Sequence, residues 1–297
     1  MSPHLNQIKI RKLCRDIGLP EVVSLVDLTS TFSNDVQVIN EKLILKSWDP
    51  ENIKWFNKEL FCLTQLQGMI PVIPKIIYSD DQGGLIGKPF MILQKLPGKT
   101  LIAVWEKLTS AQQREVISEI CGYLRKVSLL DISSVPALFP MITNWQEWTQ
   151  QEFSKNLALS RATGLLSQAE IDKITTEFKG YLPYLKEQKM QVMYYDIHFG
   201  NFLVNNGKLS GIVDFERTEW VSMDYCLNWI RRMMLAPGEY TTDKNSNPDK
   251  FKNLMILFKE YYPELFAFDH LEERLKAYAL LSDLRILVRR RINHSLK

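Results

Sequence analysis

Residues 194–216, which read YYDIHFGNFLVNNGKLSGIVDFE, decide the expected fold of this 297-residue chain. Two short apolar runs in this stretch flank the dipeptide Asn206-Gly207. Asn-Gly is a strong hairpin signal, because a type I′ turn needs positive φ at both of its central residues. The stretch therefore predicts two antiparallel strands joined by a tight turn.

The position of the turn sets the expected register of this hairpin. Val204 should pair with Leu209, which puts Asn201 opposite Ile212. Because side chains alternate along a strand, Asp214 should share a face with Ile212 and therefore with Asn201. An amide oxygen and a carboxylate at one end of a hairpin are hard ligands of the kind that Mg²⁺ prefers. We expect Asn201 and Asp214 to bind magnesium.

Asp196 lies five residues before Asn201, on the segment that enters the hairpin. A carboxylate there can accept the proton of a hydroxyl group or orient that hydroxyl toward phosphorus, which contributes roughly 10²–10⁴-fold to a rate. A single Asp before a turn is usually only a cap. The joint pattern D-x-x-x-x-N, strand, Asn-Gly turn, strand, D-F-E favours a catalytic role for Asp196.

This stretch resembles the catalytic and metal-binding loops of the aminoglycoside phosphotransferase family, which shares the protein-kinase fold. The usual form there is H-G-D-x-H-x-x-N, followed by a D-F or D-W element. The resemblance implies that Asp196 is the catalytic aspartate and that Asn201 and Asp214 hold magnesium. His198 matches the second histidine of the motif, whereas Tyr194 stands where the first histidine is usual.

The resemblance extends over roughly residues 36–227, with one further departure. Cys226 stands near a usual downstream aspartate, and Asp224 lies two positions early. In the family both departing positions mainly brace the loop, so the resemblance implies that the chemistry is retained.

The first part of the chain reads as strands with one helix. Residues 36–46 alternate around Asn40-Glu41 as a hairpin would. Asp49-Pro50 then opens a helix, with Asp49 as a possible cap and Pro50 in the first turn. Another strand, residues 89–93, leads into a linker at residues 94–98.

Lys46 and Glu59 are the expected phosphate-binding cation and its partner. The period of two puts Ile44 and Lys46 on one face, where Ile44 could cover an adenine and Lys46 could reach the phosphates. A lysine that ends a strand is more often a solvated charge. However, the pattern E-x-x-x-L-x-x-L that begins at Glu59 resembles the helix that carries the partner of this lysine in the superfamily.

The expected phosphate loop contains no glycine, since none occurs between Gly18 and Gly68. Residues 29–34 occupy its place, and we expect Ser30 and Ser33 to offer donors to phosphate. By analogy with the family, Gln94 and Leu96 would supply the backbone hydrogen bonds to adenine.

The rest of the chain reads as helical. Ser110-x-x-Gln113 and Ser167-x-x-Glu170 resemble capping boxes, and residues 270–292 form a long amphipathic pattern. The predicted fold is α+β and bilobal, of the protein-kinase type, with a catalytic hairpin in a mainly helical second lobe. We expect a nucleotide-binding lobe at residues 1–95 and a catalytic and acceptor-binding lobe at residues 96–297.

The composition is typical of a globular protein. The chain is 45% hydrophobic and 24% charged, and its net charge of +3 gives no argument for binding nucleic acid or a membrane. No apolar run approaches the roughly 20 residues of a spanning helix, and no secretory signal is visible. The four cysteines are far apart and predict buried thiols rather than a metal site. We expect a cytoplasmic protein, either monomeric or homodimeric.

The predicted function is transfer of the γ-phosphate of ATP, with magnesium, to a hydroxyl group of a small molecule. An aminoglycoside or a similar antibiotic is the first choice of acceptor. One alternative is a kinase of a metabolite, such as choline or ethanolamine, homoserine or a sugar. Another is a catalytically silent pseudokinase that serves as a binding module. A protein substrate is disfavoured, because only nine residues separate Asp214 from Asp224.

Overall fold

The structure is a computed structural model that describes residues 7–28, 34–239 and 248–295. The chain divides into two compact units whose segments alternate along the sequence. The sheet unit comprises Ser2–Leu138 and His198–Thr218, and the helical unit comprises Phe139–Ile197 and Glu219–Lys297. The predicted α+β class is confirmed. The lobe boundary expected after residue 95 stays a prediction.

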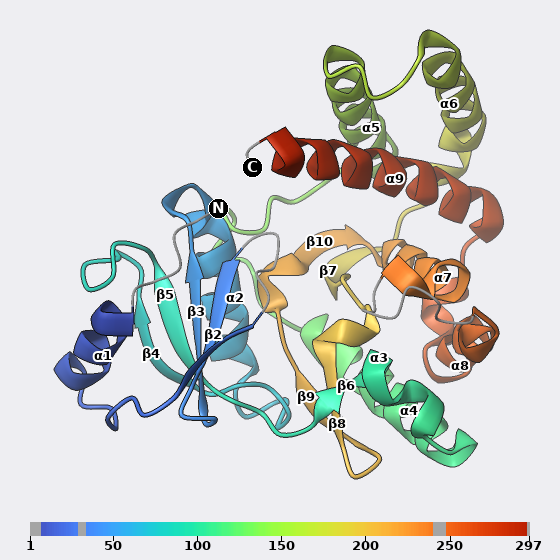
Figure 1. Ribbon diagram of the computed structural model, residues 1–297. Coiled ribbons are helices and arrows are strands. Elements are labelled where there is room, and N and C mark those ends of the chain that lie inside the picture. The colour runs from blue at the N-terminus through green and yellow to red at the C-terminus, as the bar shows by residue number, and fades with distance from the viewer. Residues whose placement is uncertain (1–6, 29–33, 240–247, 296–297) are drawn as a thin grey trace. The chain divides into compact units, whose positions relative to one another are not determined.

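A five-stranded antiparallel sheet forms the centre of the sheet unit, with the strand order β1-β2-β3-β5-β4 (Figure 1). Its strands are β1 (Leu25–Leu28), β2 (Asn34–Ile39), β3 (Leu43–Trp48), β4 (Ile76–Asp80) and β5 (Phe90–Gln94). The predicted turn between β2 and β3 is confirmed, since Asn40 and Glu41 have φ values of 50° and 57°.

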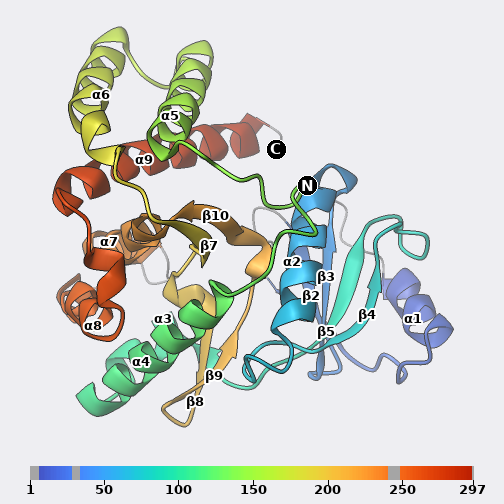
Figure 2. The same cartoon turned by 180° about the vertical axis from the view of Figure 1, so that it is seen from behind.

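Two helices pack on this sheet. Helix α1 (Gln7–Asp16) buries Ile10 in a cluster with Leu45 of β3 and Ile92 of β5. Helix α2 (Ile53–Leu66) lies along the sheet in both views (Figures 1 and 2) and contacts β3. Because side chains alternate along β3, Lys46 lies on the opposite face from Leu45 and points toward α2.

Asp49 does not cap the helix as predicted. A 3₁₀ turn at Pro50–Asn52 precedes α2, and the Asp49 side chain makes no capping hydrogen bond. Its carboxylate instead pairs with Lys88 at 2.8 Å. The competing partner lies 39 positions away in the sequence, so no local pattern could have indicated it.

The hairpin predicted around Asn206-Gly207 is confirmed, but part of its register is wrong. Strands β8 (Phe202–Asn205) and β9 (Lys208–Ile212) pair Val204 with Leu209 as expected. The register then shifts by one residue, so that Phe202, rather than Asn201, lies opposite Ile212.

Ser210 is the extra residue in β9 that causes this shift. Its hydroxyl donates a hydrogen bond to the carbonyl of Pro97 at 2.6 Å. Gly98 permits the close approach, since a Cβ atom there would lie 2.7 Å from the Ser210 hydroxyl oxygen. The short strand β6 (Lys99–Thr100) then pairs with β8 and completes a three-stranded sheet.

The sheet unit also contains α3 (Leu101–Val104) and α4 (Ser110–Val127), and α4 contacts β9. The capping box of α4 lies one residue earlier than predicted. Thr109 and Gln112 exchange the two capping hydrogen bonds, whereas Gln113 donates to the carbonyl of Trp105 at 2.9 Å. Both registers fit the sequence pattern, and the contact with Trp105 decides between them.

The described part of the helical unit consists mainly of five helices. They are α5 (Trp145–Ala162), α6 (Gln168–Tyr181), α7 (Leu227–Leu235), α8 (Leu254–Tyr261) and α9 (Leu271–Ser295). Helices α5 and α6 both pack against the long α9 (Figure 2). Strands β7 (Met190–Tyr194) and β10 (Thr218–Ser222) form a two-stranded sheet. The capping box at Ser167 and Glu170 and the long final helix are confirmed.

A buried ion pair joins α9 to the 3₁₀ turn at Met223–Cys226, which precedes α7. The Arg274 guanidinium binds both carboxylate oxygens of Asp224 at 2.7 and 3.0 Å, and both side chains are fully buried. Arg274 also donates to the carbonyls of Tyr184 and Glu187. Tyr278 donates to Asp224 at 3.0 Å. Every charge in this network has several partners, which is the condition for burying an ion pair without a large loss of stability.

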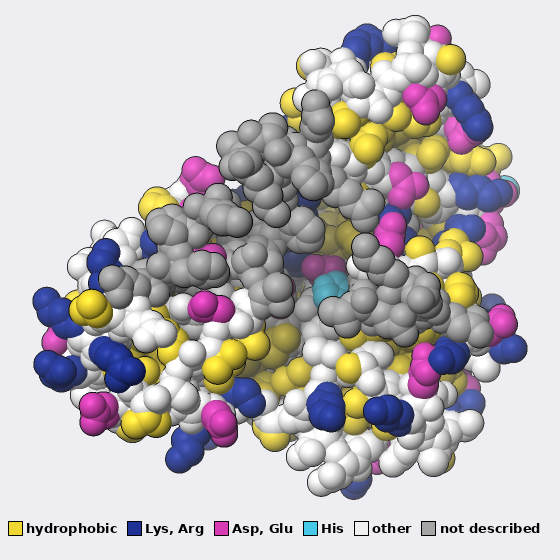
Figure 3. Space-filling view, in the orientation of Figure 1, with side chains coloured by type: hydrophobic (Ala, Val, Ile, Leu, Met, Phe, Trp, Pro, Cys, Tyr) yellow, Lys and Arg dark blue, Asp and Glu magenta, His cyan; other side chains and the backbone are white. Residues whose placement is uncertain are grey.

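The cysteines, the apolar segments and the surface charges were also considered in the sequence. All four cysteines are free and buried, as predicted. Among the described residues, no helix combines the length and the apolar composition that crossing a bilayer requires. Over the described part of the face in Figure 3, basic and acidic side chains are interspersed.

We expect Arg274→Met to lower the free energy of unfolding by about 3–5 kcal/mol, because it leaves the buried Asp224 carboxylate without its cation. Urea denaturation followed by circular dichroism would measure the change. Lys276→Met is the matched control, since Lys276 is an exposed residue on the same helix. Equal stabilities of the two variants would contradict this account of the ion pair.

Candidate functional site

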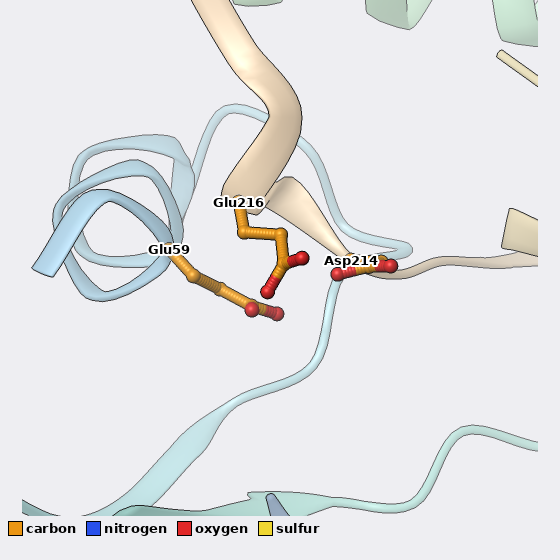
Figure 4. A group of neighbouring side chains, drawn as sticks. All are labelled: Glu59, Asp214 and Glu216. Carbon is orange, nitrogen blue, oxygen red and sulfur yellow. The ribbon is translucent and has the colours of Figure 1, made fainter. Parts of the chain in front are cut away.

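Lys46 is the centre of a buried cluster in the sheet unit. Its Nζ atom lies 2.6 Å from Oε2 of Glu59 and 2.7 Å from Oδ1 of Asp214. A third carboxylate, that of Glu216, lies 3.9 Å away. Lys46 belongs to β3. Figure 4 shows the three acids, of which Glu59 comes from α2 and the other two from the segment after β9. The structure thus brings together three of the residues that the sequence predicts, in one unit.

The carboxylates determine the protonation of Lys46. Burial alone would lower the pKa of the Lys46 ammonium, but Asp214, Glu59 and Glu216 raise it well above its ordinary value. Burial alone would raise the pKa of Asp214, and the Lys46 ammonium lowers it below its ordinary value. Lys46 and Asp214 therefore form an ion pair.

The pKa of Glu59 is raised, because this carboxyl group is buried and shares one ammonium with two other acids. Burial raises its pKa from 4.5 to about 7, the Asp214 and Glu216 carboxylates add to the shift, and Lys46 opposes it. Only 2% of its side chain is exposed. Glu59 therefore exchanges a proton near neutral pH.

Glu216 is held by two further donors. Its Oε2 atom accepts hydrogen bonds from Nδ2 of Asn34 and from Nε1 of Trp48, both at 3.0 Å. Asn34, Trp48 and Glu216 are all buried. The segment after β9 is thereby fixed to β2 and to β3.

Asp214 lies beyond the end of strand β9, so it does not follow the side-chain alternation of that strand. Strand β9 ends at Ile212, and Asp214 has a left-handed conformation with φ 67° and ψ 60°. The alternation used to put Asp214 on the face of Asn201 therefore does not apply. The N–H of Val213 donates to the carbonyl of Asn201 at 3.0 Å, so Asn201 lies opposite the residue that precedes Asp214.

These two residues fit a magnesium ion in their donor chemistry. Asp214 supplies a carboxylate that is 25% exposed, and Asn201 supplies an amide oxygen. The ligand atoms of Glu59, Asp214 and Glu216 lie within 4.8 Å of one another. Glu59 and Glu216 are each only 2% exposed, however, whereas Asp214 is 25% exposed. We therefore favour Asn201 with Asp214 as the magnesium ligands, which stays a prediction.

Asp196 lies in the helical unit, two residues after the end of β7, and is partly exposed. The next residues begin the sheet unit with a 3₁₀ turn at Phe199–Asn201. Nδ1 of His198 accepts the N–H of Gly200 at 3.1 Å and caps this turn. A Cβ atom at position 200 would lie 2.9 Å from that ring, which explains the glycine. The catalytic role of Asp196 stays a prediction.

Four further residues, Ser30, Ser33, Gln94 and Leu96, were predicted to contact the nucleotide. Ser30 and Ser33 lie outside the described residues. Gln94 is the exposed last residue of β5, and its N–H donates to the carbonyl of Lys75 at 2.8 Å. Leu96 is half-buried. None of these contacts tests the expected hydrogen bonds to adenine.

The sequence profile of the phosphotransferase enzyme family, which includes the aminoglycoside phosphotransferases, matches residues 24–225, more than half of the chain. The chain belongs to this phosphotransferase family. The predicted family and enzyme class are thereby confirmed. A comparison with curated proteins finds no significant match.

Solved structures show the fold that this phosphotransferase adopts. The GDP complex of aminoglycoside 2′-phosphotransferase-IIIa superposes with a TM-score of 0.73 at 17% identity, covering 95% of this chain and 91% of that chain. The streptomycin–ATP complex of APH(2″)-IIa gives 0.68 at 16%, covering 96% and 91%. APH(4)-Ia gives 0.68 at 12%, covering 98% and 94%. The predicted kinase-like fold is confirmed.

Two features of the candidate site were not predicted, the position of Trp48 and the hydrogen bonds that hold Glu216. A signal for Trp48 was present, because the period of two in β3 puts it on the same face as Lys46. Glu216 is part of the D-F-E pattern, but no local pattern indicates which donors would bind it.

We expect Glu59→Gln to flatten the pH dependence of stability between pH 4.5 and 7. In this range the folded chain retains a proton on Glu59 that the unfolded chain has released, so the free energy of unfolding falls as pH rises. Urea denaturation at several pH values would measure the slope. Glu51→Gln, at an exposed position before α2, is the control and should leave the slope unchanged. A slope in Glu59→Gln equal to that of the wild type would contradict the raised pKa.

Proposed function

We propose that this phosphotransferase transfers the γ-phosphate of ATP, with magnesium, to a hydroxyl group of a small molecule. The observation that carries the proposal is the contact of one buried ammonium, that of Lys46, with Glu59 and Asp214 at 2.6 and 2.7 Å. Phosphoryl transfer depends on positioning and on neutralising charge, and this cluster presents a fixed cation beside an anionic metal ligand.

Three residues of the cluster, together with Asn201, have proposed roles. Lys46 binds the phosphate oxygens of the nucleotide, and Glu59 keeps its ammonium in position. Asp214 and Asn201 hold the magnesium ion. When bound, the ion would neutralise charge on the phosphate oxygens. Gln94, Leu96, Ser30 and Ser33 are the proposed further contacts of the nucleotide.

Asp196 is the proposed catalytic residue. Its carboxylate would accept a hydrogen bond from the acceptor hydroxyl, orient the oxygen toward phosphorus and take the proton during transfer. It lies in the short segment that leads from β7 to the turn capped by His198, and Asn201 is the last residue of that turn.

An aminoglycoside or a similar antibiotic is the proposed acceptor. The solved structures that share the fold include APH(2″)-IIa with gentamicin and with streptomycin. In this chain Trp145 and Tyr194 are buried, whereas Trp148 and Trp220 are partly exposed and could stack on a ring of the acceptor. A metabolite kinase would use the same chemistry on choline or ethanolamine, homoserine or a sugar.

The pseudokinase alternative is disfavoured by the geometry of the site. A binding module has no need of a buried lysine that contacts both a helix carboxylate and a potential metal ligand, because burying charged groups costs stability. Cytoplasmic location and a monomeric or homodimeric state remain predictions.

Asp196→Asn should lower the rate of phosphate transfer by about 10²–10⁴-fold, because the acceptor hydroxyl loses its proton acceptor. The measurement is release of nucleoside diphosphate from MgATP and from MgGTP. The acceptor panel contains aminoglycosides, choline, ethanolamine, homoserine and sugars. Asp172→Asn, an exposed position in the helical unit, is the control. Unchanged phosphorylation of a true acceptor by Asp196→Asn would refute the catalytic role.

Asp214→Asn should raise the Mg²⁺ concentration needed for half-maximal transfer, because an amide is a weaker ligand for a hard cation than a carboxylate. A titration with MgCl₂ at fixed ATP and acceptor would measure the shift. Chelation of divalent cations should abolish transfer in the wild type. Full activity in the presence of excess EDTA would contradict the magnesium dependence.

A further inference from the structure

Glu216 is a buried acid next to the Lys46 ammonium for which the proposed mechanism has no role. Its side chain is 2% exposed, and its Oε2 atom lies 3.9 Å from Nζ of Lys46. This separation is longer than the direct contacts of Lys46 with Glu59 and Asp214. Glu216 therefore acts on the ammonium through its charge rather than through a short hydrogen bond.

Two N–H donors on separate strands fix the position of this charge. Nδ2 of Asn34 on β2 and Nε1 of Trp48 on β3 both bind Oε2 at 3.0 Å. Hydrogen bonds to an ionised acceptor are stronger than those between neutral groups. Because both donors belong to the sheet, Oε2 keeps a constant place relative to Lys46, which lies on β3 between them in sequence.

Trp48 is itself held in place by its surroundings. Its ring packs edge-on against Phe56 of α2, with 5.3 Å between the ring centroids, and is fully buried. Nζ of Lys46 lies 5.1 Å from the centroid of the Trp48 ring. The indole thus contacts the ammonium with its ring and Glu216 with its N–H group, so that it links the two.

The proposed reaction changes the partners of Lys46. When Asp214 binds a cation, its carboxylate is shared between that cation and Lys46. The electrostatic attraction between Asp214 and the Lys46 ammonium is then weaker. Glu216 keeps its two donors and stays in place. We propose that Glu216, oriented by Trp48 and Asn34, is a positioning residue that holds the Lys46 ammonium for the nucleotide phosphates. This inference rests on the proposed function.

The same contacts argue against Glu216 as a metal ligand. Its Oε2 atom already accepts two hydrogen bonds, from Nδ2 of Asn34 and Nε1 of Trp48, and its side chain is only 2% exposed. A cation at that oxygen would have to displace both buried donors. The role of Glu216 is therefore to place Lys46, and its loss should affect nucleotide binding more than magnesium dependence.

Two variants separate the charge of Glu216 from its orientation. Glu216→Gln keeps an oxygen that can accept the N–H groups but removes the charge, and should raise the KM for MgATP about tenfold with a smaller change in kcat. Trp48→Phe keeps a packed ring but removes the N–H group, and should raise this KM by about threefold or more. The dissociation constant of MgADP, measured by calorimetry, should rise in the same order.

The double variant tests whether Trp48 acts through Glu216. Glu216→Gln with Trp48→Phe should bind nucleotide about as weakly as Glu216→Gln alone, because the indole N–H then has no charge to orient. Trp229→Phe, on α7 of the helical unit, and Glu219→Gln are the matched controls for the two substitutions and should leave the KM for MgATP unchanged. Thermal unfolding of each variant establishes that it is folded. Trp48→Phe carries the test if Glu216→Gln does not fold.

The outcomes distinguish this role from others. Wild-type nucleotide affinity in folded Glu216→Gln and Trp48→Phe would overturn the positioning role. A raised Mg²⁺ requirement in Glu216→Gln at an unchanged KM would also overturn it, and would identify a metal ligand instead. A wild-type protein that neither binds MgADP nor phosphorylates any acceptor would refute the proposed function itself.

Discussion

The Lys46 ammonium is the contact on which the sheet unit depends, because it joins three acids that would otherwise repel one another. Glu59, Asp214 and Glu216 come from a helix and from the segment after the hairpin, and each lies within 4 Å of Nζ. Leaving an ionised carboxylate buried without a partner costs several kcal/mol. One cation therefore holds together the strand, the helix and the segment after the hairpin that form the candidate site.

In the helical unit, a buried carboxylate is likewise neutralised by a buried cation, but the cation is an arginine. Arg274 on α9 binds Asp224 through two nitrogen atoms and also binds the carbonyls of Tyr184 and Glu187. The planar guanidinium can satisfy several acceptors at once, which suits a structural junction. The lysine of the sheet unit is a compact charge with few fixed directions, which suits a site where its partners are expected to change.

The two predicted magnesium ligands lie outside regular helices and strands. Asp214 has a left-handed backbone, and Asn201 ends a 3₁₀ turn that His198 caps. Such conformations persist only where the surroundings determine them. At Asp214 the surroundings are the Lys46 ion pair and the buried Glu216 two residues later. The site is therefore a product of tertiary contacts imposed on a locally encoded hairpin.

Local interactions were sufficient to predict several features from the sequence alone. The Asn206-Gly207 turn, the face of β3 that carries Lys46 and the helix that carries Glu59 follow from backbone preferences and side-chain periods. The family motif likewise depends on neighbouring residues. The bulge at Ser210, the pairing of Asp49 with Lys88 and the bonds from Trp48 and Asn34 to Glu216 depend on partners far apart in the sequence. Asn34 and Glu216 are 182 positions apart, and only the folded chain brings such donors and acceptors together.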